Sequence, residues 1–450
     1  MKTAERIVCS KLTEHLEKHD LFNPNQHGFR RGRSCLSQLI EHQHRILKGL
    51  EINKFVDVIY MDFEKAFDKV DHSILLRKLS KIGIKGKLLH WIGDFLDNRK
   101  QKVVVEEECS DIFEVQSGVP QGTVLGPLLF LIFIADIDET VLTAAVSMFA
   151  DDTKLLMALS SQEETEDMQR DLNNTLQWAS ENNMKFNLSK FKTLRYEASS
   201  TQLPMYKLSE NQNTVMSETA KDLGITMCNN GRFDHHIRNI VKKSKMIAGW
   251  VLRTFATRET EPMLELFKTL VLPHLEYCCI IWNPFELGYI RMIEGVQRSF
   301  TARLRIGDTL TYWERLKKLK LYSLERRRER YLIIYVWKII NGLVPNIEGE
   351  DKIRTKDHLR LGKLCIIPRI NNRARTAVLS IKEGSVMVRG PKLFNSIPKE
   401  IRNMKTELDK FKTALDRFLC SIPDQPALPH YYQRANSNSL IDQVDVTRRR

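Results

Sequence analysis

Three aspartates stand at the ends of segments that have the composition of buried β-strands. Residues 55–61, FVDVIYM, are rich in β-branched and aromatic side chains and end directly before Asp62. Two further apolar runs, 144–150 and 153–159, flank the pair Asp151-Asp152, a pattern typical of a strand, a tight turn and a returning strand. If these strands are neighbours in one sheet, the three carboxylates converge at one of its ends.

Converging carboxylates repel one another unless a cation neutralises them. Mg²⁺ prefers oxygen ligands, and a pair of such ions can activate one oxygen and stabilise another during phosphoryl transfer. The alternative interpretation is that each aspartate is a solvated turn residue, and spacing alone does not decide between the two.

The charge of the chain is divided unevenly. Residues 1–230 carry 28 basic and 33 acidic side chains, which leaves 42 basic and 23 acidic side chains in 231–450 out of totals of 70 and 56. A basic region next to an acidic one is expected of an enzyme that holds metal with carboxylates and phosphate backbones with lysine and arginine. Solvated helix faces would produce the same counts.

The eight cysteines form no C-x-x-C pair and no cluster with histidine at zinc-ligand spacing, so we expect reduced thiols. No run of about 18 apolar residues is present, so a membrane-spanning helix is not expected. The first 20 residues alternate charged and apolar positions without a cleavage-site pattern, which argues against a secretory signal. An intracellular protein, in the nucleus or cytoplasm, is therefore predicted.

The remaining pattern indicates a mixed α and β chain. Helical spacing runs through 2–20, 72–98 and 162–182, and residues 101–105 with 112–115 have the alternation of a hairpin. Residues 184–188 are predicted to form a strand. The region 235–345 is mostly helical and basic and includes the arginine-rich run 326–330, and the polar tail 437–450 is predicted to be disordered.

Six segments in order make the sequence recognisable. They are QHGFRRGRSC (26–35), DVIYMDFEKAFDKVDH (57–72), SGVPQGTVLGPLLFLIFIADI (117–137), MFADDTKL (148–155), MKFNLSKFKT (184–193) and KDLGI (221–225). With these segments the sequence resembles the reverse transcriptases of non-LTR retrotransposons, the LINE-like families that include jockey and chicken-repeat-type elements.

The resemblance implies an α+β right-hand polymerase whose antiparallel palm sheet carries the aspartates. Its expected parts are partial fingers (1–54), a palm with finger insertions (55–230), a helical thumb (231–345) and a basic C-terminal extension (346–436), followed by the tail. The implied activity is RNA-directed DNA polymerisation, with an RNA template, a DNA primer or target and deoxynucleoside triphosphates as partners.

The family's catalytic residues match positions of this chain. Asp62, Asp151 and Asp152 are implied to hold two Mg²⁺ ions, with Mn²⁺ as a possible substitute; one ion activates the primer 3′-hydroxyl and the other escorts the triphosphate. Phe67, five residues after Asp62, matches the steric gate that excludes a ribose 2′-hydroxyl.

Further matches concern the nucleotide. Gln121 and Gly122 match the loop that backs the incoming nucleotide. Lys190 matches a lysine near the pyrophosphate, but the motif is interrupted here as NLSKFKT, so Lys192 competes for this role. Among the basic residues of the fingers motif, those implied to neutralise phosphate are Arg30 and Arg33, with Arg31 as an alternative.

Two matches concern the nucleic acid. Leu223 and Gly224 match the primer-grip turn, which is a feature of the backbone. A helix of the basic region could follow the backbone of a duplex, although a solvated helix face explains its charges equally well. The residues predicted to contact the duplex are Arg238, Lys242, Lys243 and Lys245.

The chain also departs from the family's pattern. Most such elements have an upstream endonuclease and further finger strands, and neither is found in this sequence, so an N-terminally truncated polymerase is expected. Two hypotheses follow: a polymerase whose centre is formed by the three aspartates, or an inactive remnant that binds nucleic acid through its basic half.

Overall fold

The computed structural model describes residues 2–52, 55–97, 99–196, 205–306, 309–369, 376–426 and 438–449. The chain forms two compact units, one made of residues 1–38 and 52–220 and the other of residues 39–51 and 221–450. Helix α2 (Cys35–Glu51) passes from the first unit into the second. Each unit is described by itself.

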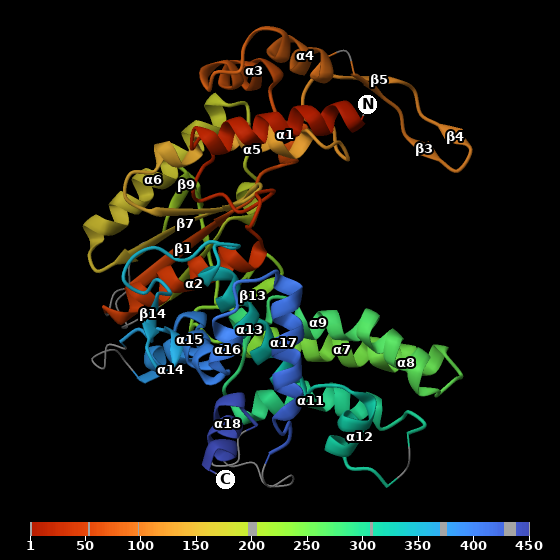
Figure 1. Ribbon diagram of the computed structural model, residues 1–450. Helices are drawn as coiled ribbons and strands as arrows, with labels where there is room; N and C mark the ends of the chain where they lie inside the picture. The colour runs from red at the N-terminus through yellow and green to blue at the C-terminus, as the bar shows by residue number, and fades with distance from the viewer. Residues whose placement is uncertain are drawn as a thin grey trace. The chain divides into compact units, whose positions relative to one another are not determined.

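A five-stranded sheet is the centre of the first unit, in the order β11-β8-β1-β7-β6 (Figure 1). The strands pair antiparallel, except that β11 runs parallel to β8. The strand predictions at 55–61, 144–150 and 153–159 are therefore confirmed. The bounds are β1 (Phe55–Met61), β6 (Ala145–Phe149), β7 (Asp152–Leu159), β8 (Lys192–Tyr196) and β11 (Val215–Met216).

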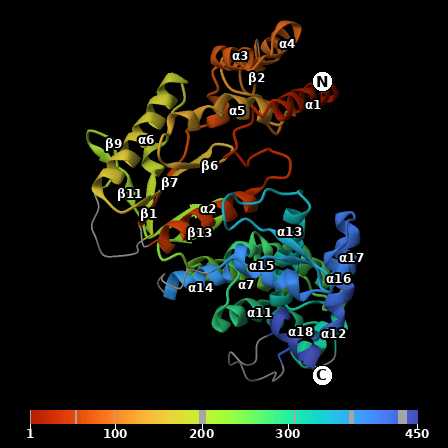
Figure 2. The same cartoon turned by 60° about the vertical axis from the view of Figure 1, so that its left-hand side comes forward.

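Two helices supply much of the core beside this sheet. Helix α5 (Gly126–Ile134) has the sequence GPLLFLIFI and is buried on all sides, as expected of a uniformly apolar helix. Helix α6 (Gln162–Glu181) is amphipathic and lies alongside the sheet (Figure 2). Its Met168 and Leu172 share one apolar cluster with strand residues such as Ile59 and Leu155.

The rest of the first unit is built from short elements, and the predicted hairpin is confirmed by the pairing of β2 with β5 and of β3 with β4. The bounds of these elements are α1 (Lys2–Lys18), η1 (Ala66–Asp68), α3 (His72–Lys81), α4 (Gly86–Leu96), β2 (Arg99–Gln101), β3 (Val104–Val105), β4 (Glu108–Cys109), β5 (Phe113–Val115), η2 (Ile137–Thr140), η3 (Leu188–Lys190), β9 (Lys207–Ser209) and β10 (Gln212–Asn213).

The prediction of a strand at 184–188 is wrong. Only a single β-bridge, between Phe63 and Phe186, is present there, and the strand of this region is β8, beginning at Lys192. The intervening chain turns through η3, and the N–H of Asn187 donates to the carbonyl of Asp62 at 2.8 Å. This turn brings Lys190 to the end of β1.

The second unit is mostly helical, as the sequence predicts. Strand β12 (Thr219–Asp222) leads into it and pairs with β13 (Ile225–Cys228). Its other elements are α7 (Asp234–Thr254), α8 (Thr260–Leu266), the π-helix η4 (Phe267–Val271), α9 (Leu272–Glu276), α10 (Cys279–Trp282), α11 (Leu287–Thr301), α12 (Tyr312–Leu319), α13 (Leu324–Ile340), β14 (Thr355–His358), β15 (Gly362–Cys365), α14 (Thr376–Gly384), α15 (Val386–Ser396), α16 (Lys399–Arg402), α17 (Leu408–Ser421) and α18 (Leu440–Arg449).

Helix α18 corrects the expectation that the tail is disordered. Its residues Leu440 and Val444 are buried, and the N–H of Leu440 donates to the Glu329 carboxylate at 2.8 Å. The apolar residues in this tail are too sparse to predict a helix alone, but two of them meet a core. Residues 427–437, which include the beginning of the predicted tail, lie outside the described residues.

Candidate active site

The predicted carboxylates lie at one end of the first unit's sheet. Asp62 follows the last residue of β1, Met61, whose partner across the ladder is Thr153. Asp152 directly precedes Thr153, and Asp151 stands in the turn between β6 and β7. Because β1 and β7 are antiparallel neighbours, the end of β1 meets the start of β7, and the three aspartates lie at the same end of the sheet.

Lys190 forms an ion pair with Asp62, with 2.5 Å between Nζ and Oδ2. This hydrogen bond raises the pKa of the Lys190 ammonium, and the negative charges of Asp151 and Asp152 act in the same direction. Lys192 is instead the exposed first residue of β8. Of the two lysines that the interrupted motif offered, the structure therefore places Lys190 at the aspartates.

The pKa of the Asp151 carboxyl group is raised from its ordinary value. Burial is the main cause that raises its pKa, and the negative charge of Asp62 adds to the shift, whereas Lys190 opposes it. The negative charge of Asp62 thus acts on Asp151, and two neighbouring carboxylates of this kind favour the binding of a cation.

These residues have the donor chemistry of a Mg²⁺ site, because carboxylate oxygens are the ligands that Mg²⁺ prefers. In the part of the chain that the structure describes, however, no three His, Cys, Asp or Glu side chains are gathered closely enough to form a ready-made metal site. The ammonium of Lys190 neutralises Asp62 instead. The residues that could hold metal are thus Asp62, Asp151 and Asp152, after Lys190 has released Asp62.

We expect Asp151→Asn to stabilise the metal-free protein at pH 7. A carboxyl group whose pKa is raised on folding favours the folded state only below its unfolded pKa, and this contribution is lost as the pH rises through the folded pKa. The ionised group is therefore unfavourable at pH 7, and its removal should raise the Tm by a few degrees at most, because water screens a carboxyl group that is only partly buried.

Thermal unfolding in EDTA measures this effect, and the difference from the wild type should narrow as the pH is lowered. Asp62→Asn is the control, because it removes a carboxylate that already has Lys190 as partner and should bring no gain. A lower Tm for Asp151→Asn at pH 7 would contradict the electrostatic argument.

Phe67 lies between two other aromatic rings. It stacks on Phe130 of α5, with ring centroids 4.3 Å apart, and meets Phe29 edge-to-face at 6.1 Å. Phe29 is 58% exposed and belongs to the arginine-rich loop before α2. Sequence reasoning missed both neighbours; an aromatic residue inside a Gly/Arg-rich loop was the available signal for Phe29.

The loop with Gln121 and Gly122 is bound to the segment that carries Phe67. The N–H of Val119 donates to the carbonyl of Phe67 at 2.8 Å, and the amide of Gln121 donates to the Asp68 carboxylate at 3.0 Å. Gly122 has a φ of +78° with open space beside its α-carbon. The two predicted nucleotide-facing segments therefore form one surface.

The arginines of the fingers motif differ in their surroundings. Arg30 donates to the carbonyl of Asn23 at 2.8 Å and lies over the ring of Phe22; burial, and then the charge of Arg33, lower its pKa to about 10. Arg33 donates to the carbonyl of Pro24 at 2.6 Å. Both help to close the loop on itself, whereas Arg31 is exposed.

The sequence profile of the family described as reverse transcriptase (RNA-dependent DNA polymerase) matches residues 1–227. The chain belongs to the reverse transcriptase family. The predicted resemblance to non-LTR retrotransposon enzymes is confirmed. The mixture of helices and a mainly antiparallel sheet agrees with the predicted α+β class of the fold.

Two curated relatives of this chain come from mobile elements. A probable RNA-directed DNA polymerase from transposon X-element of Drosophila melanogaster is 24% identical over 315 residues, which are 68% of this chain and 34% of the relative. The RNA-directed DNA polymerase from mobile element jockey of the same species is 26% identical over 320 residues, 67% of this chain and 34% of the relative. The chain spans about a third of the length of the curated relatives it matches.

Among solved structures, apo telomerase from Candida tropicalis is similar at 11% sequence identity and a TM-score of 0.40, over 76% of this chain and 54% of that one. Candida albicans telomerase in complex with a telomeric RNA fragment is similar at 11% identity and a TM-score of 0.36, over 70% of this chain and 53% of that one.

Within the residues that the structure describes, no helix has the length and apolar character needed to cross a membrane.

The predicted primer-grip turn lies in the second unit. Leu223 and Gly224 both have positive φ, +43° and +85°, and a residue that the sequence did not single out holds them. The hydroxyl of Tyr277 donates to the carbonyl of Leu223 at 2.8 Å, and its ring would be 3.2 Å from a Cβ at Gly224.

The predicted nucleic-acid contacts of the second unit lie on one helix. Arg238, Lys242, Lys243 and Lys245 are exposed on α7, while its Ile237 and Val241 are buried. Arg238 donates to the hydroxyl of Tyr289 at 3.4 Å. The exposed face is basic, as expected, and its role remains a prediction.

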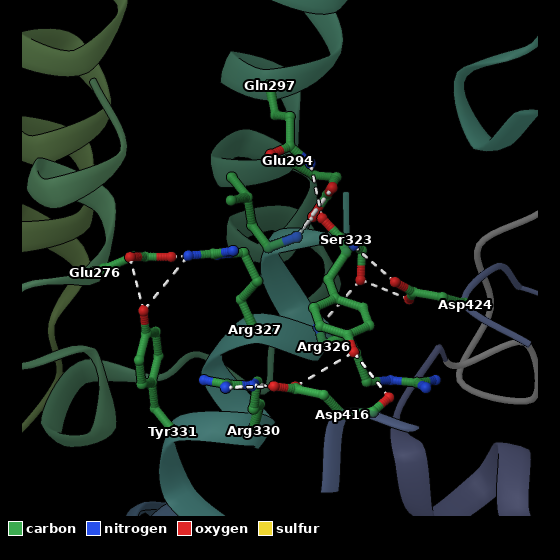
Figure 3. Close-up of polar contacts among 12 residues, drawn as sticks. Glu276, Glu294, Gln297, Ser323, Arg326, Arg327, Arg330, Tyr331, Asp416 and Asp424 are labelled. Carbon is green, nitrogen blue, oxygen red and sulfur yellow. Dashed lines mark hydrogen bonds and ion pairs between the residues drawn. The ribbon is translucent and has the colours of Figure 1, made fainter. Parts of the chain in front are cut away.

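The arginine-rich run 326–330 does not add to that basic surface. Arg326 and Arg328 are buried, and their neighbours pair with acids of other helices (Figure 3): Arg330 with Asp416 at 2.5 Å, and Arg327 with Glu276. The interpretation of the whole basic half as a nucleic-acid surface is therefore wrong at this helix, because acids from α9 and α17 fold against it.

Proposed function

We propose that this chain is the polymerising part of a non-LTR retrotransposon protein, an RNA-directed DNA polymerase that adds deoxynucleotides to a primer 3′-hydroxyl. The observation that carries the proposal is that Asp62, Asp151 and Asp152 lie at the same end of the sheet. Next to them is the segment of Phe67, whose ring lies between the rings of Phe29 and Phe130. The match of the family profile over 1–227 supports it.

In this proposal, Asp62, Asp151 and Asp152 are the metal ligands. Reverse transcriptases generally use divalent metal ions; two Mg²⁺ ions, or Mn²⁺ in their place, would supply the charge that activates the primer hydroxyl and neutralises the pyrophosphate. Lys190 moves from Asp62 to the triphosphate. Arg30, Arg31 and Arg33 provide cations near it.

The nucleotide is selected by the surface around Phe67. The ring of Phe67 fills the space of a 2′-hydroxyl. Phe130 stacks on this ring and keeps it from moving away from the nucleotide. Gln121 and Gly122 form the wall behind the nucleotide. An RNA template paired with a DNA primer or target lies along Leu223, Gly224 and the basic face of α7. Such substrates place the protein inside the cell, in the nucleus or cytoplasm.

Primer extension tests this function. We expect the purified chain to extend oligo(dT) on poly(rA) with dTTP and Mg²⁺, and not to extend it without a template. A folded wild-type protein that incorporates no dTTP would overturn the proposal. Binding to poly(rA)/oligo(dT) with a steep salt dependence would then favour the inactive nucleic-acid-binding remnant.

Phe67→Val is expected to weaken discrimination against ribonucleotides. The smaller side chain leaves room for a 2′-hydroxyl, so the efficiency of UTP relative to dTTP should rise by about 10–100-fold on poly(rA)/oligo(dT). Phe133→Leu, a buried change in the same helix as Phe130, should leave the ratio unchanged. Equal ratios for the wild type and Phe67→Val would refute the steric role.

A further inference from the structure

Gln26 binds two backbone segments of the first unit through a single side-chain amide. It is 2% exposed and lies in the loop between α1 and α2. Its Oε1 accepts from the N–H of Ala150 at 2.8 Å and from the N–H of Gly28 at 2.7 Å, and its Nε2 donates to the carbonyl of Ala150 at 3.1 Å. Both polar atoms of the amide therefore bond to the backbone of Ala150, and the oxygen also bonds to the backbone of Gly28.

Ala150 is the residue directly before Asp151, and its backbone is in the left-handed region with a φ of +54°. L-residues with a Cβ rarely adopt this conformation, and it persists only where the surroundings hold it. The Gln26 amide satisfies both the N–H and the carbonyl of Ala150. It is therefore placed to hold the turn that aims the Asp151 carboxylate.

The backbone of the loop also bonds to β6, the strand that leads into this turn. The N–H of His27 donates to the carbonyl of Met148 at 3.0 Å, and the N–H of Met148 donates to the carbonyl of Asn25 at 3.1 Å. A Cβ at Gly28 would lie 2.4 Å from the nitrogen of Ala150, so only glycine permits this approach. The next residue along the loop is Phe29, which meets the ring of Phe67.

We propose that Gln26 is a positioning residue that fixes the Asp151 turn and, through the same oxygen, the loop that carries Phe29 and Arg30. The inference rests on the proposed function, in which Asp151 of the turn binds metal and the loop faces the nucleotide. One side chain thereby couples the carboxylate that binds metal to the loop that faces the triphosphate.

The bonding pattern requires glutamine. It needs an oxygen that accepts two hydrogen bonds and a donor at the same end of the side chain. Glutamate keeps the acceptor but loses the donor, and it would place a negative charge against the Ala150 carbonyl. Methionine keeps the length and loses all three hydrogen bonds. We therefore expect Gln26→Glu to weaken the hold on the turn less than Gln26→Met does.

The test is Gln26→Met, read out by Mn²⁺ binding in electron paramagnetic resonance without nucleotide, and by primer extension over a range of Mg²⁺ concentrations. We expect the dissociation constant for Mn²⁺ and the Mg²⁺ concentration at half-maximal rate to rise about 10-fold. The maximal rate should fall, while the affinity for poly(rA)/oligo(dT) stays unchanged. Gln26→Glu should show a smaller loss of metal affinity and carries the test if Gln26→Met does not fold.

Two further variants separate positioning from general stability. Gln38→Met removes another buried glutamine of this unit, one whose Oε1 accepts from Lys154 at 3.1 Å, and should leave Mn²⁺ affinity within about twofold. Ala150→Gly should restore part of the affinity lost in Gln26→Met, because glycine adopts a positive φ without strain.

The inference is overturned if folded Gln26 variants bind Mn²⁺ as the wild type does, if Gln38→Met weakens Mn²⁺ binding equally, or if Ala150→Gly brings no rescue. Failure of the proposed function has a different signature. A wild type that binds Mn²⁺ but does not extend a primer, with Gln26→Met still weakening Mn²⁺ binding, would refute polymerisation and retain the positioning role.

Discussion

Asp151→Ala is expected to lower the rate of dTTP incorporation on poly(rA)/oligo(dT) by about a thousandfold or more. Asp151 is half-buried near Asp62, and the two negative charges together favour the binding of a cation. Asp151→Ala removes one of these charges and, with it, a proposed ligand of the metal ion. Single-turnover primer extension at saturating dTTP measures the effect on the chemical step.

Two other aspartates calibrate this prediction. Asp152 is exposed at the start of β7, so Asp152→Ala should cost less than Asp151→Ala. Asp167, on α6, pairs with Arg170 and lies outside the proposed centre, so Asp167→Ala should leave the rate unchanged. Retention of a tenth or more of the wild-type rate by Asp151→Ala would remove this residue from the catalytic centre.

Asp57→Ala is expected to reduce the free energy of unfolding by about 3–5 kcal/mol. The reason is that the buried guanidinium of Arg195 loses the carboxylate that neutralises it. Asp57, in the middle of β1, is fully buried and faces Arg195 across the ladder to β8. Its carboxylate accepts from Nε and Nη2 of Arg195 at 2.8 and 2.7 Å and from the Tyr206 hydroxyl at 2.7 Å. Burial and the charge of Asp57 raise the pKa of Tyr206.

Urea denaturation followed by tryptophan fluorescence measures the loss. The double variant Asp57→Ala with Arg195→Met removes the stranded charge and should recover part of the stability. A cost below about 1 kcal/mol for the single variant would show that water or another partner replaces the carboxylate. Since Asp62 lies five residues further along the chain, directly after β1, the variant should also weaken the proposed metal site.

The strands and the aspartates at their ends could be predicted because the pattern is local. Runs such as 55–61 and 153–159 have the composition of buried strands, and an acid directly before or after such a run lies at an end of its strand. The order of six family motifs then identified the chain. Helices with clear apolar spacing, such as α6, follow from the same local rule.

Contacts between distant segments could not be predicted in this way. The choice of Lys190 over Lys192 depends on a turn that ties Asn187 to Asp62. The arginines of the run 326–330 are paired with acids that are distant in sequence. Glu276 is 51 residues from Arg327, and Asp416 is 86 residues from Arg330. The helical tail depends on a carboxylate, Glu329, that accepts from Leu440.

The sequence by itself determined the family, the α+β class and the identity of the candidate carboxylates, since these follow from residue type, order and short-range periodicity. The tertiary structure alone decided which cations meet which acids, that Phe29 and Phe130 enclose Phe67, and that Gln26 holds the turn before Asp151. The physical reason is that hydrogen bonds and ion pairs act over a few ångströms in space, whatever the separation along the chain.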